Sequence, residues 1–288
     1  MKILPCGGVG KDARPWDEGV WRGWHKRCSA AGVNVGLFQA AAALDADQKW
    51  QDTVADNLAY GSLTGYKRQE LSFEAMQAGL MPYNQPGAKN EPQSFVVPMA
   101  TSSANFETGE LKPTKVNTDV AIDGKGFFGV QLPTGEVLYT RDGEFHVNTA
   151  SQLVTKEGYP VLGLTPGSPI PTPIQLSKTS HSPVSISVTG EVSQDDGVKG
   201  KLKLTNFDKP NLLAPATGSY FMADAKAVKE VPTDATLRQG YVEASNVSSV
   251  TEMVSLMTAM RSYESNAKVI QMEDDHMGHA IQELGNPQ

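Results

Sequence analysis

The sequence offers little thiol chemistry, because only two of its 288 residues are cysteines. Cys6 and Cys28 are too few for a disulfide framework, and their separation fits neither a thiol-redox motif nor a zinc motif. The sequence also lacks any window near the ~18 consecutive apolar residues that a membrane-spanning helix needs. We therefore expect neither a disulfide-stapled fold nor insertion into a membrane.

Clusters of basic residues are missing as well. The chain has 25 Lys and Arg against 32 Asp and Glu, which gives a net charge of -7. Without a Lys/Arg cluster it lacks the electrostatic signature of a nucleic-acid-binding protein, so nucleic acid is not an expected partner. The first six residues, through Cys6, are too few to form the apolar core of a signal peptide, and we expect no cleaved leader.

No catalytic, cofactor or metal site is recognisable. The segment 124–129 spells G-x-G-x-x-G, but strand-like and turn-like residues follow where a dinucleotide site needs a helix, so we interpret its glycines as shaping a hairpin. His276 and His279 lie three residues apart beside acidic residues, without a third ligand, and a solvated helix face explains them equally well. The sequence predicts that the protein is not an enzyme and holds neither a cofactor nor a metal.

The N-terminal segment, residues 1–33, differs in composition from the rest of the chain. It contains three of the four tryptophans and six basic against three acidic residues. We treat it as an atypical N-terminal extension. One hypothesis is that translation naturally starts at Val33; the competing one is a real extension whose tryptophans dock on a neighbouring protein.

Helical periodicity marks both ends of the remaining chain. Apolar residues at intervals of three and four predict a helix over about 34–60, and the glycine-containing stretch 61–65 ends it. A heptad pattern predicts a second helix over about 249–284, which would be ~54 Å long. Its seam positions are Met253, Leu256, Met260, Tyr263, Ala267, Ile270, Asp274, Met277, Ile281 and Leu284, all apolar except Asp274.

A narrow apolar seam on so long a helix requires a partner helix. The N-terminal helix is the intramolecular candidate; it offers Leu37, Leu44 and Leu58, but Asp47, Gln48 and Gln51 weaken its stripe. An ordinary two-helix contact within one domain is the alternative. Because a single pair of helices cannot cover both faces of such seams, we expect the ends to be partly disordered in the monomer and to fold on assembly.

Between these helices the apolar period changes to two. Short β-rich runs separated by Asp-Gly turns predict an all-β, hairpin-rich domain over about 117–223, divided by the proline-rich stretch 165–173 into two groups of strands. The stretch 81–98 has no period and is predicted to be a linker or an extended crossing. We predict an α+β fold: a discontinuous, coiled-coil-like helical domain (34–75 plus 240–288) brackets a linker and central β domain (76–239).

Four ordered motifs resemble a known family. Asp56-Asn57-Leu58-Ala59 followed by Thr64-Gly65-Tyr66-Lys67 resembles the N-terminal signature of bacterial flagellar rod and hook proteins. Further matches follow in the family's order at 119–128 with 139–145, at 158–163, and at 240–247 with 252–254 and 261–268. Together the motifs cover about 34–284. One departure is Tyr60-Gly61-Ser62-Leu63, which stands where the family favours an Asn-rich turn.

The resemblance implies a structural subunit of the flagellar basal-body rod that contributes to flagellum-dependent motility. Such subunits are exported unfolded through the flagellar type III channel and stack through their terminal helices, with other rod and hook subunits, into the periplasm-spanning axial tube. The length favours a rod subunit over a hook subunit, and we favour a proximal-type over a distal-type position. A hook subunit and a non-flagellar surface interaction protein are the alternatives.

Overall fold

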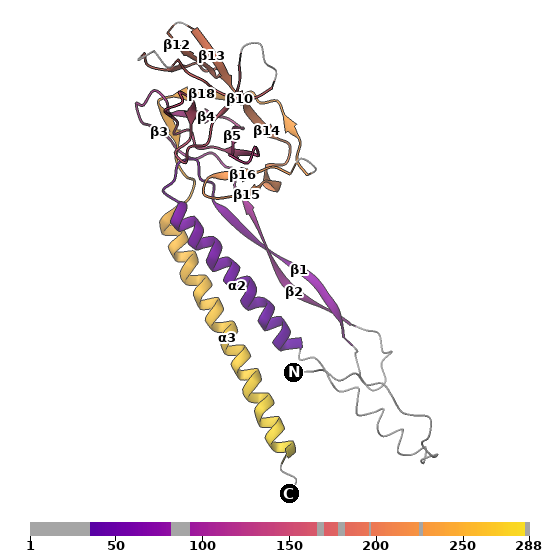
Figure 1. Ribbon diagram of the computed structural model, residues 1–288. Coiled ribbons are helices and arrows are strands. Elements are labelled where there is room, and N and C mark those ends of the chain that lie inside the picture. Colours follow the sequence, from indigo (N-terminus) through magenta and orange to yellow (C-terminus); the bar gives the residue numbers. More distant parts are fainter. Residues whose placement is uncertain are drawn as a thin grey trace, which may run out of the picture.

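The computed structural model describes residues 35–81, 93–165, 170–177, 182–195, 197–224 and 227–285. The molecule has an elongated helical stalk and a β head at one end of it (Figure 1). The stalk comprises the two helices and one long hairpin, and the β head comprises residues 105–248. The N-terminal extension 1–33 lies outside the described residues.

The two helices run side by side in opposite directions (Figure 1). Helix α2 spans Val35–Tyr60 and ends at the head, whereas α3 spans Ser249–Gly285 and leads away from it. Gly65, at φ +67°, completes the turn that leaves α2. The α+β prediction and both helix predictions are confirmed. Neither helix, within the described residues, combines the length and hydropathy that crossing a bilayer requires.

The stalk also contains a hairpin that the sequence did not reveal. Strand β1 (Gln69–Met81) pairs antiparallel with β2 (Gln93–Ala104), with a register shift between Gln77 and Gly79. Met81 and residues 93–98, expected as part of a linker or an extended crossing, therefore belong to strands. A two-stranded ribbon buries little of either face, so its sequence carries no one-sided alternation.

Helix α2 lies between α3 and this hairpin (Figure 1). The ring of Trp50 meets that of Phe73 edge to face, with centroids 6.1 Å apart. Gln39 Nε2 donates a hydrogen bond of 3.1 Å to the carbonyl of Val96. The N-terminal helix thus packs against partners on two sides within one chain.

Two antiparallel sheets form most of the β head, in the orders β15-β16-β6-β5-β14-β17 and β10-β9-β13-β12-β11. The strands of the first sheet are β5 (Phe127–Gln131), β6 (Val137–Thr140), β14 (Leu204–Phe207), β15 (Ala214–Pro215), β16 (Tyr220–Met222) and β17 (Glu230–Val231). Those of the second are β9 (Leu162–Leu164), β10 (Thr172–Pro173), β11 (Ser185–Ile186), β12 (Glu191–Gln194) and β13 (Gly197–Leu202). Three pairs complete the head, β4 (Val120–Asp123) with β18 (Thr236–Gln239), β3 (Leu111–Pro113) with β19 (Tyr241–Glu243), and β7 (His146–Val147) with β8 (Leu153–Val154); a short 3-10 helix spans Pro210–Leu212.

Two sequence predictions about the head need correction. The proline-rich stretch does not divide the strands into two groups, because it connects β9 to β10, which are neighbours in one sheet. The glycines of the G-x-G-x-x-G segment do not shape a hairpin. Gly124, at φ +122°, lies in the corner between β4 and β5, which belong to different sheets. The chain changes direction at this corner, and β4 and β5 do not pair with each other.

The core of the head comprises two apolar clusters. The larger one includes Val120, Phe128, Phe145 and Ile174, and in it the rings of Phe128 and Phe145 meet edge to face at 5.1 Å. The smaller one is aromatic and includes Phe127 and Phe221. At about 25 cal/mol per Å² of buried apolar surface, these clusters are the main source of the head's stability.

Candidate assembly interface

One face of α3 packs on α2. Ala259 is fully buried there, and Leu256 and Ile270, on the same side of the helix, are half-buried. Tyr263 lies on this side as well but is more exposed. Part of the seam that the heptad predicted therefore packs on the N-terminal helix α2.

Polar residues tie the two helices together along this contact. Asn266 Nδ2 donates to Asp47 Oδ2 at 2.7 Å, and Gln51 Nε2 donates to the carbonyl of Ala259 at 3.4 Å. Asp47 and Gln51 looked like flaws in an apolar stripe. In the structure they form hydrogen bonds between the helices, which set the register of the pair because each needs one particular partner.

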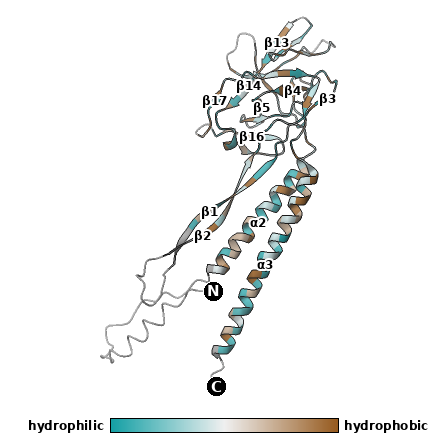
Figure 2. Ribbon diagram, turned by 180° about the vertical axis from the view of Figure 1, so that it is seen from behind, coloured by the Kyte–Doolittle hydropathy of each residue, from teal (hydrophilic) through white to brown (hydrophobic). Residues whose placement is uncertain are grey.

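A second apolar face of α3 points away from α2. We call it the outer patch; its members, each between 49% and 75% exposed, are Val250, Met253, Val254, Met257 and Met260. Their spacing of three and four residues places them on one stripe of the helix, opposite Ala259. Figure 2 shows hydrophobic residues among the first turns of α3. A contiguous exposed apolar stripe on a helix is a candidate protein interaction surface.

The heptad merged these two faces into one seam. In a straight α-helix a seven-residue repeat drifts by about 20° per heptad, so one row moves around the helix. The row that begins at Met253 starts on the outer patch, is half-buried at Ala267, and ends at Ile281, which is 70% exposed. The sequence could have revealed the outer patch through the i, i+3, i+4, i+7 spacing of its first four members.

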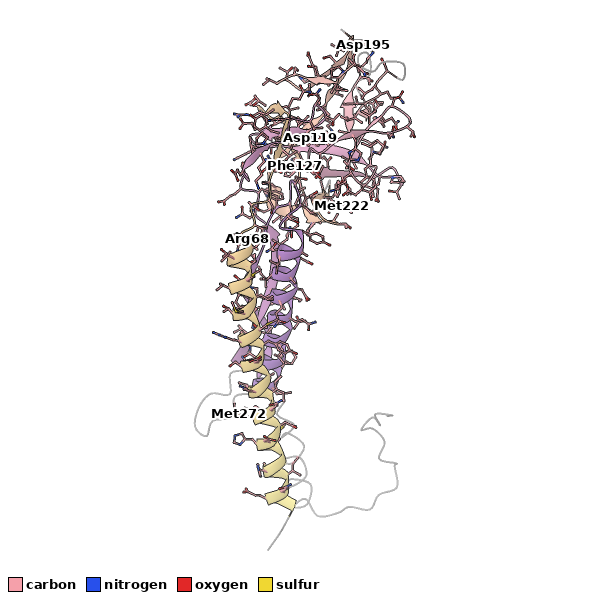
Figure 3. The ribbon with its side chains drawn as sticks, turned by 90° about the vertical axis from the view of Figure 1, so that its left-hand side faces the viewer. Arg68, Asp119, Phe127, Asp195, Met222 and Met272 are labelled. Atoms are coloured by element: carbon pink, nitrogen blue, oxygen red, sulfur yellow. The ribbon has the colours of Figure 1, made fainter. Side chains whose placement is uncertain are left out.

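The other predicted seam residues lie as follows. Leu37, Leu44 and Leu58 are half-buried on α2, Met277 is exposed on the far half of α3, and the side chain of Leu284 lies outside the described part of the chain. Met272, labelled in Figure 3, is a further exposed apolar residue on that half.

His276 and His279 are exposed on the far half of α3 too, and the described residues contain no cluster of three metal-ligating side chains.

The N-terminal motif residues gather where the helices meet the head, a region that we call the joint; Arg68 marks it in Figure 3. Asn57 is buried and uses its whole amide. Its Nδ2 donates to the carbonyl of Gln69 at 2.8 Å and to Glu252 Oε2 at 3.4 Å, while its Oδ1 accepts from the amide of Gln69 and from Tyr66 Oη. One side chain thereby joins α2, α3 and the start of the hairpin.

A buried charge network lies next to it. Lys67 Nζ donates to Glu243 Oε1 at 2.5 Å and to the carbonyl of Glu107 at 2.6 Å. Arg141 Nη1 donates to Glu243 Oε2 at 3.1 Å, and the amide of Gly109 donates to the same carboxylate. Burial lowers the pKa of Lys67 and of Arg141, and Glu243 opposes that effect. Glu243 and Arg141 did not stand out as site residues in the sequence.

The turn after α2 is held against the head by close packing. A side chain at Gly65 would bring a Cβ within 2.2 Å of the amide nitrogen of Asp142, so only glycine fits. Thr64 Oγ1 donates to Asp142 Oδ1 at 2.7 Å, and the amide of Glu144 donates to the same oxygen at 3.0 Å. The stalk and the head therefore meet in a rigid joint rather than through a linker.

Replacing Asp142 with asparagine is expected to stabilise the protein above neutral pH. Burial raises the pKa of Asp142 to about 6, against 3.8 for a free side chain, so the folded protein binds its proton more tightly than the unfolded chain. Stability is therefore lost as pH rises from about 4 to 6. One pKa unit corresponds to about 1.4 kcal/mol. In urea unfolding, Asp142→Asn is therefore expected to raise the free energy of unfolding by up to about 3 kcal/mol at pH 8 and by little at pH 4. Asp45→Asn, at an exposed carboxylate, serves as the control; no gain at pH 8 from Asp142→Asn would contradict the expectation.

The chain is similar to known protein families. Residues 121–194 match the flagellar hook protein FlgE/F/G D1 domain, and residues 238–283 match the C-terminal domain of the flagellar basal body rod FlgEFG proteins. The flagellar basal-body rod protein FlgG of Borreliella burgdorferi is 34% identical over 266 residues, which cover 85% of this chain and 96% of that protein.

Two other relatives show the same extent of similarity. FlgG of Agrobacterium fabrum is 33% identical, with 83% of this chain and 95% of that protein covered. The rod protein FlgF of Caulobacter vibrioides is 33% identical over 237 residues, with 81% and 91% covered. Because these matches span the stalk as well as the head, the similarity extends beyond a shared β domain.

Proposed function

Because the chain belongs to the family of flagellar basal-body rod proteins, we propose that it is a structural subunit of the bacterial flagellar rod that polymerises through its two terminal helices. The relatives named as rod proteins support the structural role, and the family is not one of enzymes. Its place is the flagellar basal body, and its partners are other rod and hook subunits. Through the rod it contributes to motility.

The observation that carries the mode of assembly is the outer patch. The α2–α3 pair already buries one face of α3 within the chain, so the patch is left for another subunit. Burying a methionine side chain contributes roughly 1.5–3 kcal/mol, so five apolar side chains supply enough energy for a specific lateral contact. The helices of neighbouring subunits then pack in a coiled-coil-like manner, and contacts that do not close into a ring build a filament.

The same proposal covers the organisation of the chain. Residues 34–75 and 240–288 act as the discontinuous assembly domain, and 76–239 contain the part that faces outward from the tube. The subunit reaches the rod through the flagellar type III export apparatus without a cleaved signal. We also propose a proximal position along the rod. The relatives' names specify no position, so this part rests on the sequence alone.

Mass spectrometry of purified hook–basal bodies tests this function. We expect tryptic peptides from both α2 and α3, and an N-terminal peptide that begins near Val33. Recovery of peptides from residues 12–27 would show that the extension is translated. That result would overturn the start at Val33 but not the rod function. Absence of the chain from intact basal bodies would overturn the rod function.

A further inference from the structure

A cavity of about 390 Å³ lies between the turn after α2 and the underside of the head, close to the joint. Tyr60, Ser62, Leu63 and Thr64 line one side of it, and strand ends of the head line the other. Met222, labelled on the underside of the head in Figure 3, lines its wall. This volume falls in the range of ligand-binding pockets.

Acidic groups dominate the charge of this cavity. The buried Asp142, the half-buried Glu144 and the exposed Glu157 line it, against a single basic residue, the exposed Lys156. After burial, the charges of Glu144 and Glu157 also contribute to raising the pKa of Asp142. Such a concentration of like charge is unfavourable unless a cation joins it.

One carboxylate oxygen of Asp142 is engaged by the protein, and the other accepts no hydrogen bond from the residues that the structure describes. The residue is only 7% exposed, and its Oδ1 accepts both of the bonds described above. No residue that the structure describes donates a hydrogen bond to Oδ2. Oδ2 is not one of the described buried atoms that lack a partner, so it is open to solvent, and because the side chain lines the cavity a donor from outside can reach it there.

Aromatic rings complete the walls. Tyr159 and Tyr220 meet edge to face with centroids 5.6 Å apart, and Tyr220 Oη donates to Glu157. Ring faces attract cations, and carboxylates bind the N–H groups of a guanidinium at directed positions. The described residues contain no three-ligand metal cluster, which favours an organic cation.

We propose that this cavity binds the basic side chain, guanidinium or ammonium, of a neighbouring rod subunit. The inference rests on the proposed function for the identity of the partner, whereas the recognition chemistry belongs to the cavity itself. An arriving cation compensates the excess of negative charge and donates a hydrogen bond to Asp142 Oδ2. The subunit thereby gains a charged contact beside its joint, in addition to the apolar contact of the outer patch.

The test is an NMR titration of the full-length protein that follows the pKa of the Asp142 carboxyl. The probe is Nα-acetyl-L-arginine methylamide, and the norleucine analogue, with the same backbone and no charge, is the control at matched ionic strength. We expect the arginine probe alone to lower the pKa of Asp142 saturably, by roughly 0.5 or more. Glu157→Gln is expected to weaken probe binding about threefold or more, and Lys156→Gln, which removes the resident competitor, to strengthen it.

An unchanged pKa, an equal effect of the norleucine analogue, or indifference to both substitutions would overturn the proposal. Thermal unfolding of each variant shows whether it is folded, and Lys156→Gln changes an exposed side chain, so at least one variant remains informative. The titration uses isolated protein. Failure here, with the chain present in basal bodies, would reject the cavity proposal and leave the rod function standing.

Discussion

Replacing Glu243 with glutamine is expected to lower the free energy of unfolding by about 3–5 kcal/mol. Among the residues that the structure describes, Glu243 is the one acidic partner of two buried basic side chains, Lys67 and Arg141, whose exposed fractions are 0% and 3%. Glutamine keeps the shape but removes the charge, so both cations lose their compensation where water cannot replace it. Denaturant unfolding followed by circular dichroism measures the loss.

A matched substitution separates this effect from the loss of an ordinary ion pair. Glu230 pairs with Lys203 at 3.1 Å, but its side chain is 52% exposed, so Glu230→Gln is expected to cost at most about 1 kcal/mol. Adding Lys67→Met to Glu243→Gln removes one of the stranded cations and is expected to restore part of the stability. Equal losses from Glu243→Gln and Glu230→Gln would contradict the role assigned to the buried network.

Aspartates at Met253 and Met257 together are expected to abolish rod assembly while leaving the monomer as stable as the wild type. Both side chains are about half exposed, so in the monomer the new charges remain in water. At a subunit contact the same charges would be buried without partners, which costs several kcal/mol. Motility and electron microscopy of basal bodies report assembly, and thermal unfolding of the purified protein reports stability.

Two comparisons sharpen this prediction. Thr258→Asp places a charge on the same exposed turn but outside the outer patch, and rods are expected to form normally. Leu256→Asp and Ile270→Asp place it on the α2 side; they are expected to block assembly by separating the helices, so amide exchange in α2 rises while the head stays protected. Normal rods from the double aspartate variant would show that the outer patch is not an interface.

The sequence predicted the elements whose signals are local. Both helices were found because their apolar residues repeat every three or four positions, and the β region because its strands alternate between turns. The family resemblance, carried by motifs such as Thr64-Gly65-Tyr66-Lys67, is confirmed by the similarity to rod proteins. The long hairpin was missed, since neither of its faces is buried enough to leave an apolar pattern.

The candidate site was predicted less completely than the fold. The heptad repeat identified apolar residues on α3, but it could not separate the α2 side from the outer patch. The drift of a heptad row around a straight helix becomes visible only when a packed neighbour marks one face. The role of the motif residues was also hidden. Asn57 and Lys67 are conspicuous in the motif, but their partners Glu252 and Glu243 lie 195 and 176 residues further along the chain.

By itself, then, the sequence determined which segments are helical, that the middle of the chain is β-rich, and the family to which the chain belongs, because periodicity and motif order are properties of neighbouring residues. Only the tertiary structure decided which face of α3 the contact with α2 leaves exposed, how the stalk is locked to the head, and that three carboxylates line one cavity. Those features depend on groups that are distant in the chain and adjacent in space, where burial changes the energy of a charge or an apolar surface.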